Sequence, residues 1–218
     1  MRIAWPTGSR FPALLLFATL SAVAACSSAP PDDTASYVAS IARSRGEKDA
    51  AFKASASPIP FDKHAQYLPL GYFPVDATYA APAGLQPLAD DAVRAEAVLE
   101  MPTSTGEKRQ MRRVGTLQFV LKGQSLKLTA FNEVGSTDTN HLFVPFTDLT
   151  TGTETYAAGR YLDLDRNATG VYIVDFNKAY FPYCYYNPTF DCPYPPSENR
   201  LKIPIRAGER LKTSAPAH

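Results

Sequence analysis

The chain has 218 residues, of which 45% are hydrophobic and 20% are charged, and its formal net charge at pH 7 is +1. A charge this close to zero argues against partners held by bulk electrostatic attraction, such as nucleic acid or an anionic membrane surface. The 12 Tyr, 12 Phe and 19 Pro residues favour short strands and ordered loops over a helical bundle, because aromatic residues suit strands and proline interrupts regular structure.

The N-terminus has the pattern of a bacterial secretion signal over residues 1–25. Arg2 and Arg10 form a positive head, and the apolar run that follows is shorter than the ~20 residues that span a bilayer. Residues 23–26, Val-Ala-Ala-Cys, resemble the lipobox of bacterial lipoproteins, in which Cys26 becomes the acylated N-terminus. The alternative is a plain secretory signal that is cut near residue 25 and leaves Cys26 free.

The lipobox predicts where the protein resides. A chain that begins at Cys26 would hang from a membrane by its lipid and face the periplasm, where disulfides can persist. Ser27 follows the cysteine, whereas an Asp there tends to retain lipoproteins in the inner membrane, so we expect the outer membrane. The membrane is therefore the expected partner, nucleic acid is not, and no protein partner is indicated.

The predicted domain organisation is a short tether, a helix and one β-rich domain. Asp33 or Thr34 can cap the helix, and Ser57-Pro58-Ile59-Pro60 ends it because proline cannot continue a helix. The predicted segments are a signal over residues 1–25, a tether over 26–33, a helix over 34–56, a β-rich domain over 57–210 and a tail over 211–218.

Alternating apolar residues predict short strands after the helix. The clearest pair has Leu117 and Phe119 on one face and Leu126 and Leu128 on the next strand, with residues 122–125 as the hairpin turn. Six to nine such strands after one helix predict a mainly β fold, an antiparallel β-sandwich or β-barrel with one N-terminal helix. Further strands are predicted around residues 72–79, 93–100, 142–146, 154–164, 171–177 and 202–206.

Several sequence blocks resemble a bacterial family known only as domain of unknown function 1684. The similarity runs from about residue 52 to residue 209 and implies membership of that family, without an activity. The family carries Asn-Pro where this chain has Phe181-Pro182, so a role for that amide is absent here. The blocks are residues 72–76, 103–106, 145–148, 152–156, 159–163, 175–177, 179–180, 184, 192–193, 195–196, 198–201 and 207–209.

Polar residues of the two strands predicted at 154–164 and 171–177 suggest a ligand site. Residues two apart in a strand point the same way, so these side chains would converge if the two strands pair. A guanidinium between carboxylates can hold an anion or a sugar, or can form a closed salt-bridged network that only stabilises the sheet. The predicted ligand-binding residues are Glu154, Tyr156, Arg160, Asp175 and Asn177.

Cys184 and Cys192 enclose seven residues, and outside the cytoplasm we predict that they form a disulfide. A loop of this size would gain roughly 2–3 kcal/mol from the cross-link in the loop-entropy model. The alternatives are a reactive thiol or a metal site with a histidine. Neither His64 nor His141 lies in a recognisable catalytic pattern, and the cysteine spacing is not that of a zinc knuckle. The prediction therefore includes no metal and no cofactor.

Three classes of function remain open at this point. The first is an envelope protein that binds a small polar or anionic ligand or an envelope component, or that has a structural role. The second is a hydrolase with Glu154 or Asp175 as general acid or base and Arg160 as anion stabiliser. The third is a partner-binding module that uses the Tyr-rich loop over residues 180–194 as its contact surface.

Overall fold

The computed structural model describes residues 33–88, 97–136, 138 and 140–212. The predicted signal, Cys26 and the tether up to residue 32 lie outside the described residues, as do residues 213–218 of the tail. Among the residues so described, no helix has the length and apolar character needed to span a bilayer.

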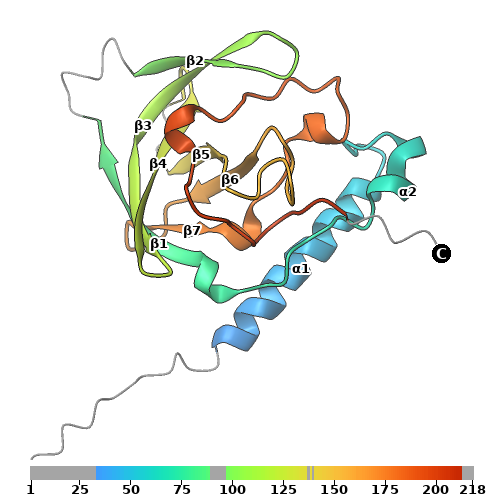
Figure 1. Cartoon of the computed structure of the whole chain (residues 1–218), viewed down its shortest axis with the longest axis horizontal. Coiled ribbons are helices and arrows are strands. Elements are labelled where there is room, and N and C mark those ends of the chain that lie inside the picture. The colour runs from blue at the N-terminus through green and yellow to red at the C-terminus, as the bar shows by residue number, and fades with distance from the viewer. Residues whose placement is uncertain (1–32, 89–96, 137, 139, 213–218) are drawn as a thin grey trace, which may run out of the picture. The chain divides into compact units, whose positions relative to one another are not determined.

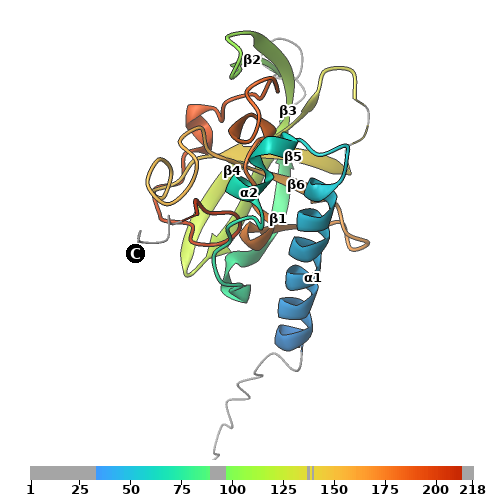
Figure 2. The same cartoon turned by 90° about the vertical axis from the view of Figure 1, so that its right-hand side faces the viewer.

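The first element is the helix α1, Asp33–Lys53, close to the helix predicted over 34–56. Its Ile41 and Phe52 are buried, and polar side chains hold it to the rest of the domain. The Tyr37 hydroxyl donates to Asp175 Oδ1 at 2.8 Å, and Lys48 Nζ lies 2.6 Å from Glu209 Oε1. The helix is thus fixed by charged and hydroxyl contacts as well as by apolar packing. Figures 1 and 2 show α1 running beside the β-sheet.

The strands form one antiparallel sheet that is nearly closed into a barrel (Figure 1). Its neighbour order is β6-β5-β4-β3-β1-β7, and β2 pairs with β3 outside this path. A bridge between Arg166 and Tyr172 joins the two ends of the order, β6 and β7. The predicted mainly β fold is therefore confirmed, in its barrel form. The strands are β1 Ala80–Pro87, β2 Val98–Pro102, β3 Lys108–Leu121, β4 Gln124–Glu133, β5 His141–Phe146, β6 Arg160–Asp165 and β7 Tyr172–Asp175.

The predicted hairpin is the β3–β4 pair. Leu117 lies opposite Leu128 and Phe119 opposite Leu126, so one face of the hairpin is apolar. The turn residues Lys122 and Gly123 have φ of 48° and 78°. Positive φ at both central residues is the conformation whose twist matches paired strands.

Other predicted strands differ from the structure. Residues 72–79 and 202–206 form no strand, and residues 154–159 form a turn in which Thr150 O accepts the N–H groups of Glu154 and Thr155. Of the strand predicted at 93–100, residues 93–96 lie outside the described residues. The strand β1 was not predicted, because its sequence AAPAGLQP lacks large β-forming residues. It forms through pairing with both β3 and β7.

The barrel interior is the main core, and the C-terminal segment closes one of its ends. Leu117, Leu128, Val144, Leu162 and Val174 are fully buried there, each contributing about 1.5–3 kcal/mol through burial. From the C-terminal segment, Leu201, Ile205 and Ala207 pack into the same cluster. The remaining short helices are η1 Phe61–Lys63, α2 His64–Tyr67, η2 Ala77–Tyr79, η3 Phe176–Lys178, η4 Tyr183–Tyr185 and η5 Ser197–Asn199.

Candidate functional site

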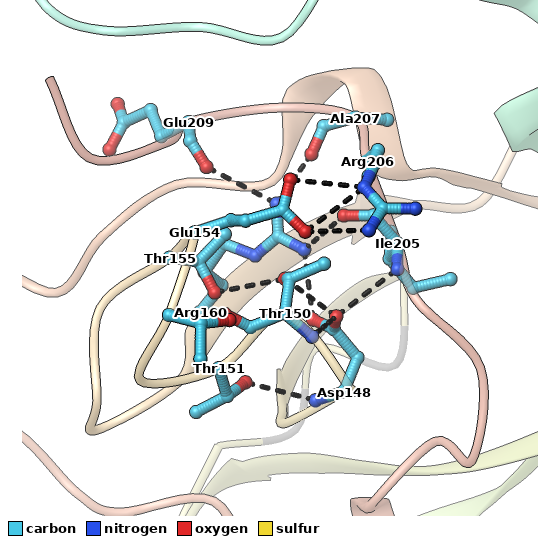
Figure 3. A network of polar contacts seen from close by, with 11 residues as sticks. Asp148, Thr150, Thr151, Glu154, Thr155, Arg160, Ile205, Arg206, Ala207 and Glu209 are labelled. Carbon is cyan, nitrogen blue, oxygen red and sulfur yellow. Dashed lines mark hydrogen bonds and ion pairs between the residues drawn. The ribbon is translucent and has the colours of Figure 1, made fainter. Parts of the chain in front are cut away.

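Arg160, the first residue of β6, lies at the centre of a closed polar network (Figure 3). Its side chain is fully buried. Nη2 donates to Asp148 Oδ2 at 2.9 Å and to the carbonyl of Ile205 at 2.7 Å, and Nη1 donates to the carbonyls of Ala207 and Glu209. Burial lowers the pKa of Arg160, and Asp148 opposes that shift by favouring the charged form. The guanidinium therefore ties the C-terminal segment to the barrel.

Asp148 is equally occupied by protein groups. Its Oδ1 accepts from the Thr150 N–H at 2.8 Å, from the Thr150 hydroxyl at 2.7 Å and from the Ile205 N–H at 3.1 Å. Both members of the ion pair are thus buried, and both terminal nitrogens of Arg160 and both carboxylate oxygens of Asp148 are hydrogen-bonded, whereas Arg160 Nε is buried without a partner. Such a pair favours a structural role, because neither side chain is exposed and its partners are all groups of the protein.

Glu154 joins this network through its backbone, whose N–H donates to the carbonyl of Thr150 at 2.9 Å, but its side chain has a partner other than Arg160. Its carboxylate pairs with the exposed Arg206, whose Nη2 lies 2.8 Å from Oε1 (Figure 3). The prediction assumed an extended strand from residue 154, but residues 154–159 form a turn. The alternation of side chains therefore does not continue from Glu154 to Arg160.

Asp175 and Asn177 do lie together, as predicted, but apart from Arg160. Asp175 Oδ1 accepts from Tyr37 Oη at 2.8 Å and from Asn177 Nδ2 at 3.1 Å. Asn177 also bonds the backbone of Asp76 through both ends of its amide. Burial and the neighbouring Asp175 raise the pKa of Tyr37. Both side chains are buried, so this second network anchors α1.

Tyr156, the fifth predicted residue, lies in a third location. Its half-buried ring is 5.0 Å from the ring of Tyr185 and 6.1 Å from that of Phe181. Burial raises the pKa of its hydroxyl, and the neighbouring Cys184 adds to that shift. The five predicted residues therefore form no single site, and their role in ligand binding stays a prediction.

An open cavity of about 930 Å³ lies elsewhere, between α1, the outer face of β5 and β6, and residues 180–193. Pockets of a few hundred to about a thousand Å³ are typical of small-molecule sites. Its wall combines aromatic rings with charged groups. Phe143, Tyr161, Tyr180, Tyr183 and Phe190 supply rings, and Arg109, His141, Asp163 and Asp191 supply charged or ionisable groups.

The aromatic wall consists of two sets of ring contacts, one on the sheet side and one on the loop side. The Tyr161 ring lies 4.7 Å from Phe143 and 5.8 Å from Tyr180, both in edge-to-face geometry. On the loop side, Tyr183 and Phe190 lie 5.3 Å apart. These contacts hold the rings in defined orientations and leave other ring surfaces for the cavity.

The polar wall centres on Asp163. The Tyr180 hydroxyl donates to Asp163 Oδ2 at 2.7 Å, and His141 Nε2 lies 3.8 Å from Oδ1. His141 Nδ1 is hydrogen-bonded to Asp165 Oδ1 at 2.9 Å, and this bond raises the pKa of His141. Burial raises the pKa of Tyr180, and the Asp163 charge adds to that shift, so Tyr180 stays a hydrogen-bond donor.

The cations of the cavity are already paired. Arg109 Nη2 lies 3.0 Å from Asp191 Oδ2. Lys48 Nζ is bound to Glu209, whose other carboxylate oxygen accepts from the Phe181 N–H at 2.6 Å and the Tyr186 hydroxyl at 2.9 Å. Lys48 also lies 4.8 Å from the centre of the Tyr180 ring. The aromatic wall is thereby linked to the buried carboxylate.

Sequence reasoning missed His141 and Asp163 as site residues, although the pattern contains a signal. On β6, Asp163 and Asp165 alternate with the buried Leu162 and Leu164, and His141 lies opposite Asp165 in the register of β5 and β6. Alternation therefore places the polar groups on the outer face of the sheet. Recognising them required knowing that these two strands pair.

Cys184 and Cys192 are both present as buried free thiols. The Cys184 N–H donates to Cys192 Sγ at 3.2 Å, so the predicted partners are adjacent without a bond between their sulfurs. No group of three or more His, Cys, Asp or Glu side chains suited to a metal ion occurs in the part of the chain that the structure describes.

Comparison with known proteins identifies the family. An uncharacterized protein of Haloarcula marismortui, solved by solution NMR, is 34% identical, with a TM-score of 0.61 over 82% of this chain and 96% of that chain. No curated protein matches the sequence significantly. The model of the family described as "Protein of unknown function (DUF1684)" matches residues 65–210. The chain therefore belongs to the DUF1684 family.

Proposed function

We propose that this protein binds a small, hydroxyl-rich polar ligand, of the size of a short oligosaccharide, in the cavity beside β5 and β6. The observation that supports this function is the combination of aromatic rings and a carboxylate acceptor in one open space of about 930 Å³. By contrast, the Arg160 network and the Asp175–Asn177 pair are filled by their own protein partners.

The chemistry of the wall suits a sugar. The C–H faces of a pyranose pack on aromatic rings such as Tyr180 and Tyr183. Sugar hydroxyls donate hydrogen bonds, and Asp163 is an ionisable acceptor on the cavity wall. A hydrogen bond to a charged acceptor contributes about 1.5–3 kcal/mol, more than one between neutral groups.

The charges favour a neutral or cationic ligand over an anionic one. Four carboxylates line the cavity, those of Glu133, Asp138, Asp163 and Asp191, against the two permanent cations Lys48 and Arg109. Both cations already pair with carboxylates of the protein. An anion would therefore meet a net negative surface, and like charges at close range disfavour binding.

A charge series of sugars tests this proposal. We expect cellobiose and glucosamine to bind, by saturation-transfer NMR and isothermal calorimetry, and glucuronate to bind at least tenfold more weakly than glucosamine. Asp163→Asn should weaken cellobiose binding about tenfold, which corresponds to about 1.4 kcal/mol. Glu154→Gln is the matched control and should bind as the wild type does. Stronger binding of glucuronate, or no binding of any sugar, would reject the proposal.

A hydrolase is the second candidate, and His141 favours it. This histidine lies between Asp163 and Asp165 at the cavity, and its raised pKa increases the protonated fraction near neutral pH, as a general acid requires. Neither of the two cavities found among the described residues is lined by Glu154, Asp175 or Arg160. Wild-type turnover of nitrophenyl glycosides that is lost in His141→Gln would support the hydrolase. A wild-type protein that binds sugars without turning over these substrates would contradict it and favour the binding function.

The envelope location remains a proposal drawn from the sequence of residues 1–33. We infer that the lipid on Cys26 attaches the domain to the outer membrane, facing the periplasm. Metabolic labelling with a palmitate analogue tests the anchor. Label should appear in the wild type and be absent from Cys26→Ser, and fractionation should move that variant out of the membrane. A wild-type protein without label would contradict the anchor.

A further inference from the structure

The two cysteines of the Tyr-rich loop form a compact thiol pair. They come together because residues 182–193 fold back on themselves, and the Cys184 N–H donates to Cys192 Sγ at 3.2 Å. Both residues are almost fully buried, with 8% and 7% of their surfaces exposed. Neither thiol has a part in the proposed ligand site beyond the position of Cys192 in its wall.

Ser104, in the turn between β2 and β3, holds this pair in place. Its Oγ accepts the N–H of Cys192 at 3.1 Å, and its own N–H donates to the carbonyl of Cys192 at 3.0 Å. Its hydroxyl also donates to the carbonyl of Phe190 at 3.0 Å. The backbone on both sides of Cys192 is therefore fixed against the barrel, so the two sulfurs keep their proximity.

The surroundings of the pair favour one thiolate and one thiol. The hydrogen bond with Cys192 lowers the pKa of Cys184 to about 6, although burial opposes the shift. The same hydrogen bond to Cys184, together with burial, raises the pKa of Cys192. At neutral pH the pair therefore carries one negative charge, with the Cys192 proton shared toward Cys184.

We propose that Cys184 and Cys192 form a peroxide-reactive dithiol, with Cys184 as the attacking thiolate and Cys192 as the resolving thiol. The small exposed area of the two residues disfavours a bulky oxidant, whereas hydrogen peroxide is little larger than water. Cys192 lines the open cavity, which provides a path to the pair. Oxidation-sensitive cysteines typically combine thiolate character with a neighbouring resolving cysteine.

The reaction balances with hydrogen peroxide as the sole oxidant. The Cys184 thiolate attacks one peroxide oxygen, the O–O bond breaks, and hydroxide leaves to become water by taking a proton from solvent. The resulting sulfenic acid is attacked by Cys192 Sγ, so an S–S bond forms as the S–O bond breaks. The departing hydroxide takes the Cys192 proton and becomes a second water. Two thiols and one peroxide thus yield one disulfide and two waters.

This inference relates two of the alternatives that the sequence left open. A disulfide and a reactive thiol become the oxidised and reduced states of one site. The inference does not depend on the ligand of the cavity.

Peroxide titration of the full chain carrying Cys26→Ser tests the proposal, because that change leaves two cysteines. The reduced protein should lose two hydrogens in its intact mass after one equivalent of peroxide, and dithiothreitol should restore them. With dimedone present, Cys192→Ser should accumulate one adduct on Cys184. Cys184→Ser is the matched control and should react at least tenfold more slowly. Circular dichroism checks that each variant is folded.

The pH dependence separates this site from an ordinary buried thiol. The oxidation rate should rise through about pH 6 and then level off, because it follows the Cys184 thiolate. A rate that rises through the usual thiol range near pH 8.5 would overturn the proposal. Equal dimedone labelling of the two single variants, or no oxidation of the folded wild type, would overturn it as well.

Discussion

Two faces of strand β6 carry polar groups with opposite surroundings. Arg160 points inward with Leu162 and Leu164, and its two terminal nitrogens donate to Asp148 and to backbone carbonyls. Asp163 points outward with Asp165, has 43% of its side chain exposed, and lines an open cavity. The comparison shows that a charged residue of β6 has a structural environment when it faces the barrel interior and is available to a ligand when it faces outward, whatever its residue type.

The inner network is closed, whereas the outer one retains capacity for a ligand. Desolvation makes a buried ion pair costly to break, because the remaining partner is left as an uncompensated charge. An exposed ion pair contributes little to stability because water and salt screen it. We therefore expect changes on the inner face to affect stability first, and changes on the outer face to affect binding first.

The largest effect is expected from Arg160→Met. The change leaves Asp148 buried and without its cation, so the free energy of unfolding should fall by about 3–5 kcal/mol in urea denaturation. Arg206→Met is the matched control, since its pair with Glu154 is exposed, and should denature like the wild type. Equal stability of the two variants would remove the distinction between the networks.

A smaller loss is expected from Glu209→Gln, which connects the two faces. The Glu209 carbonyl accepts from Arg160, and its carboxylate holds Lys48 at the cavity and accepts from Tyr186. Loss of the charge should lower the free energy of unfolding by about 2–3 kcal/mol, because a hydrogen bond to a charged group contributes about 1.5–3 kcal/mol. Thermal unfolding measures the loss of stability, and cellobiose calorimetry measures whether the change at Lys48 also alters ligand binding. Unchanged stability would show that this carboxylate does not anchor α1.

The smallest effect is a pH dependence from His141. Its pKa is raised in the folded state, so its contribution to stability is fully present below the unfolded pKa of about 6.5 and is lost as pH rises through the folded pKa. Because its side chain is half exposed, the stability gained over His141→Asn at pH 5.5 should be under about 1 kcal/mol. Urea denaturation at pH 5.5 and 8.5 checks the sign, and a larger advantage at pH 8.5 contradicts it.

Elements with strong local patterns were predictable from the sequence. The β3–β4 hairpin follows from the alternation of Leu117, Phe119, Leu126 and Leu128, and α1 was predictable from its candidate cap residues and from the prolines that follow it, although it ends earlier, at Lys53. The strand β1 could not be predicted, because its Ala and Gly residues have weak strand preference and its formation depends on pairing with two distant strands.

The candidate site was predictable only in part, for a related reason. Asp148, the partner of Arg160, lies in the loop after β5, and no periodic pattern marks such a contact. The proximity of Cys184 and Cys192 follows from their short spacing. The cavity, by contrast, lies between α1, the outer sheet face and the Tyr-rich loop. These segments are distant in the sequence, so their contact depends on long-range packing that no local pattern predicts.

The most direct test of the central claim is to map cellobiose binding by amide NMR on the labelled full chain. The account predicts that shifts concentrate at His141, Phe143, Asp163, Tyr180 and Cys192, while Glu154, Asp175 and their neighbours stay unchanged. Shifts centred on Glu154 and Arg206, or on the Asp175–Asn177 pair, would contradict the account and return the ligand site to the residues that the sequence first suggested.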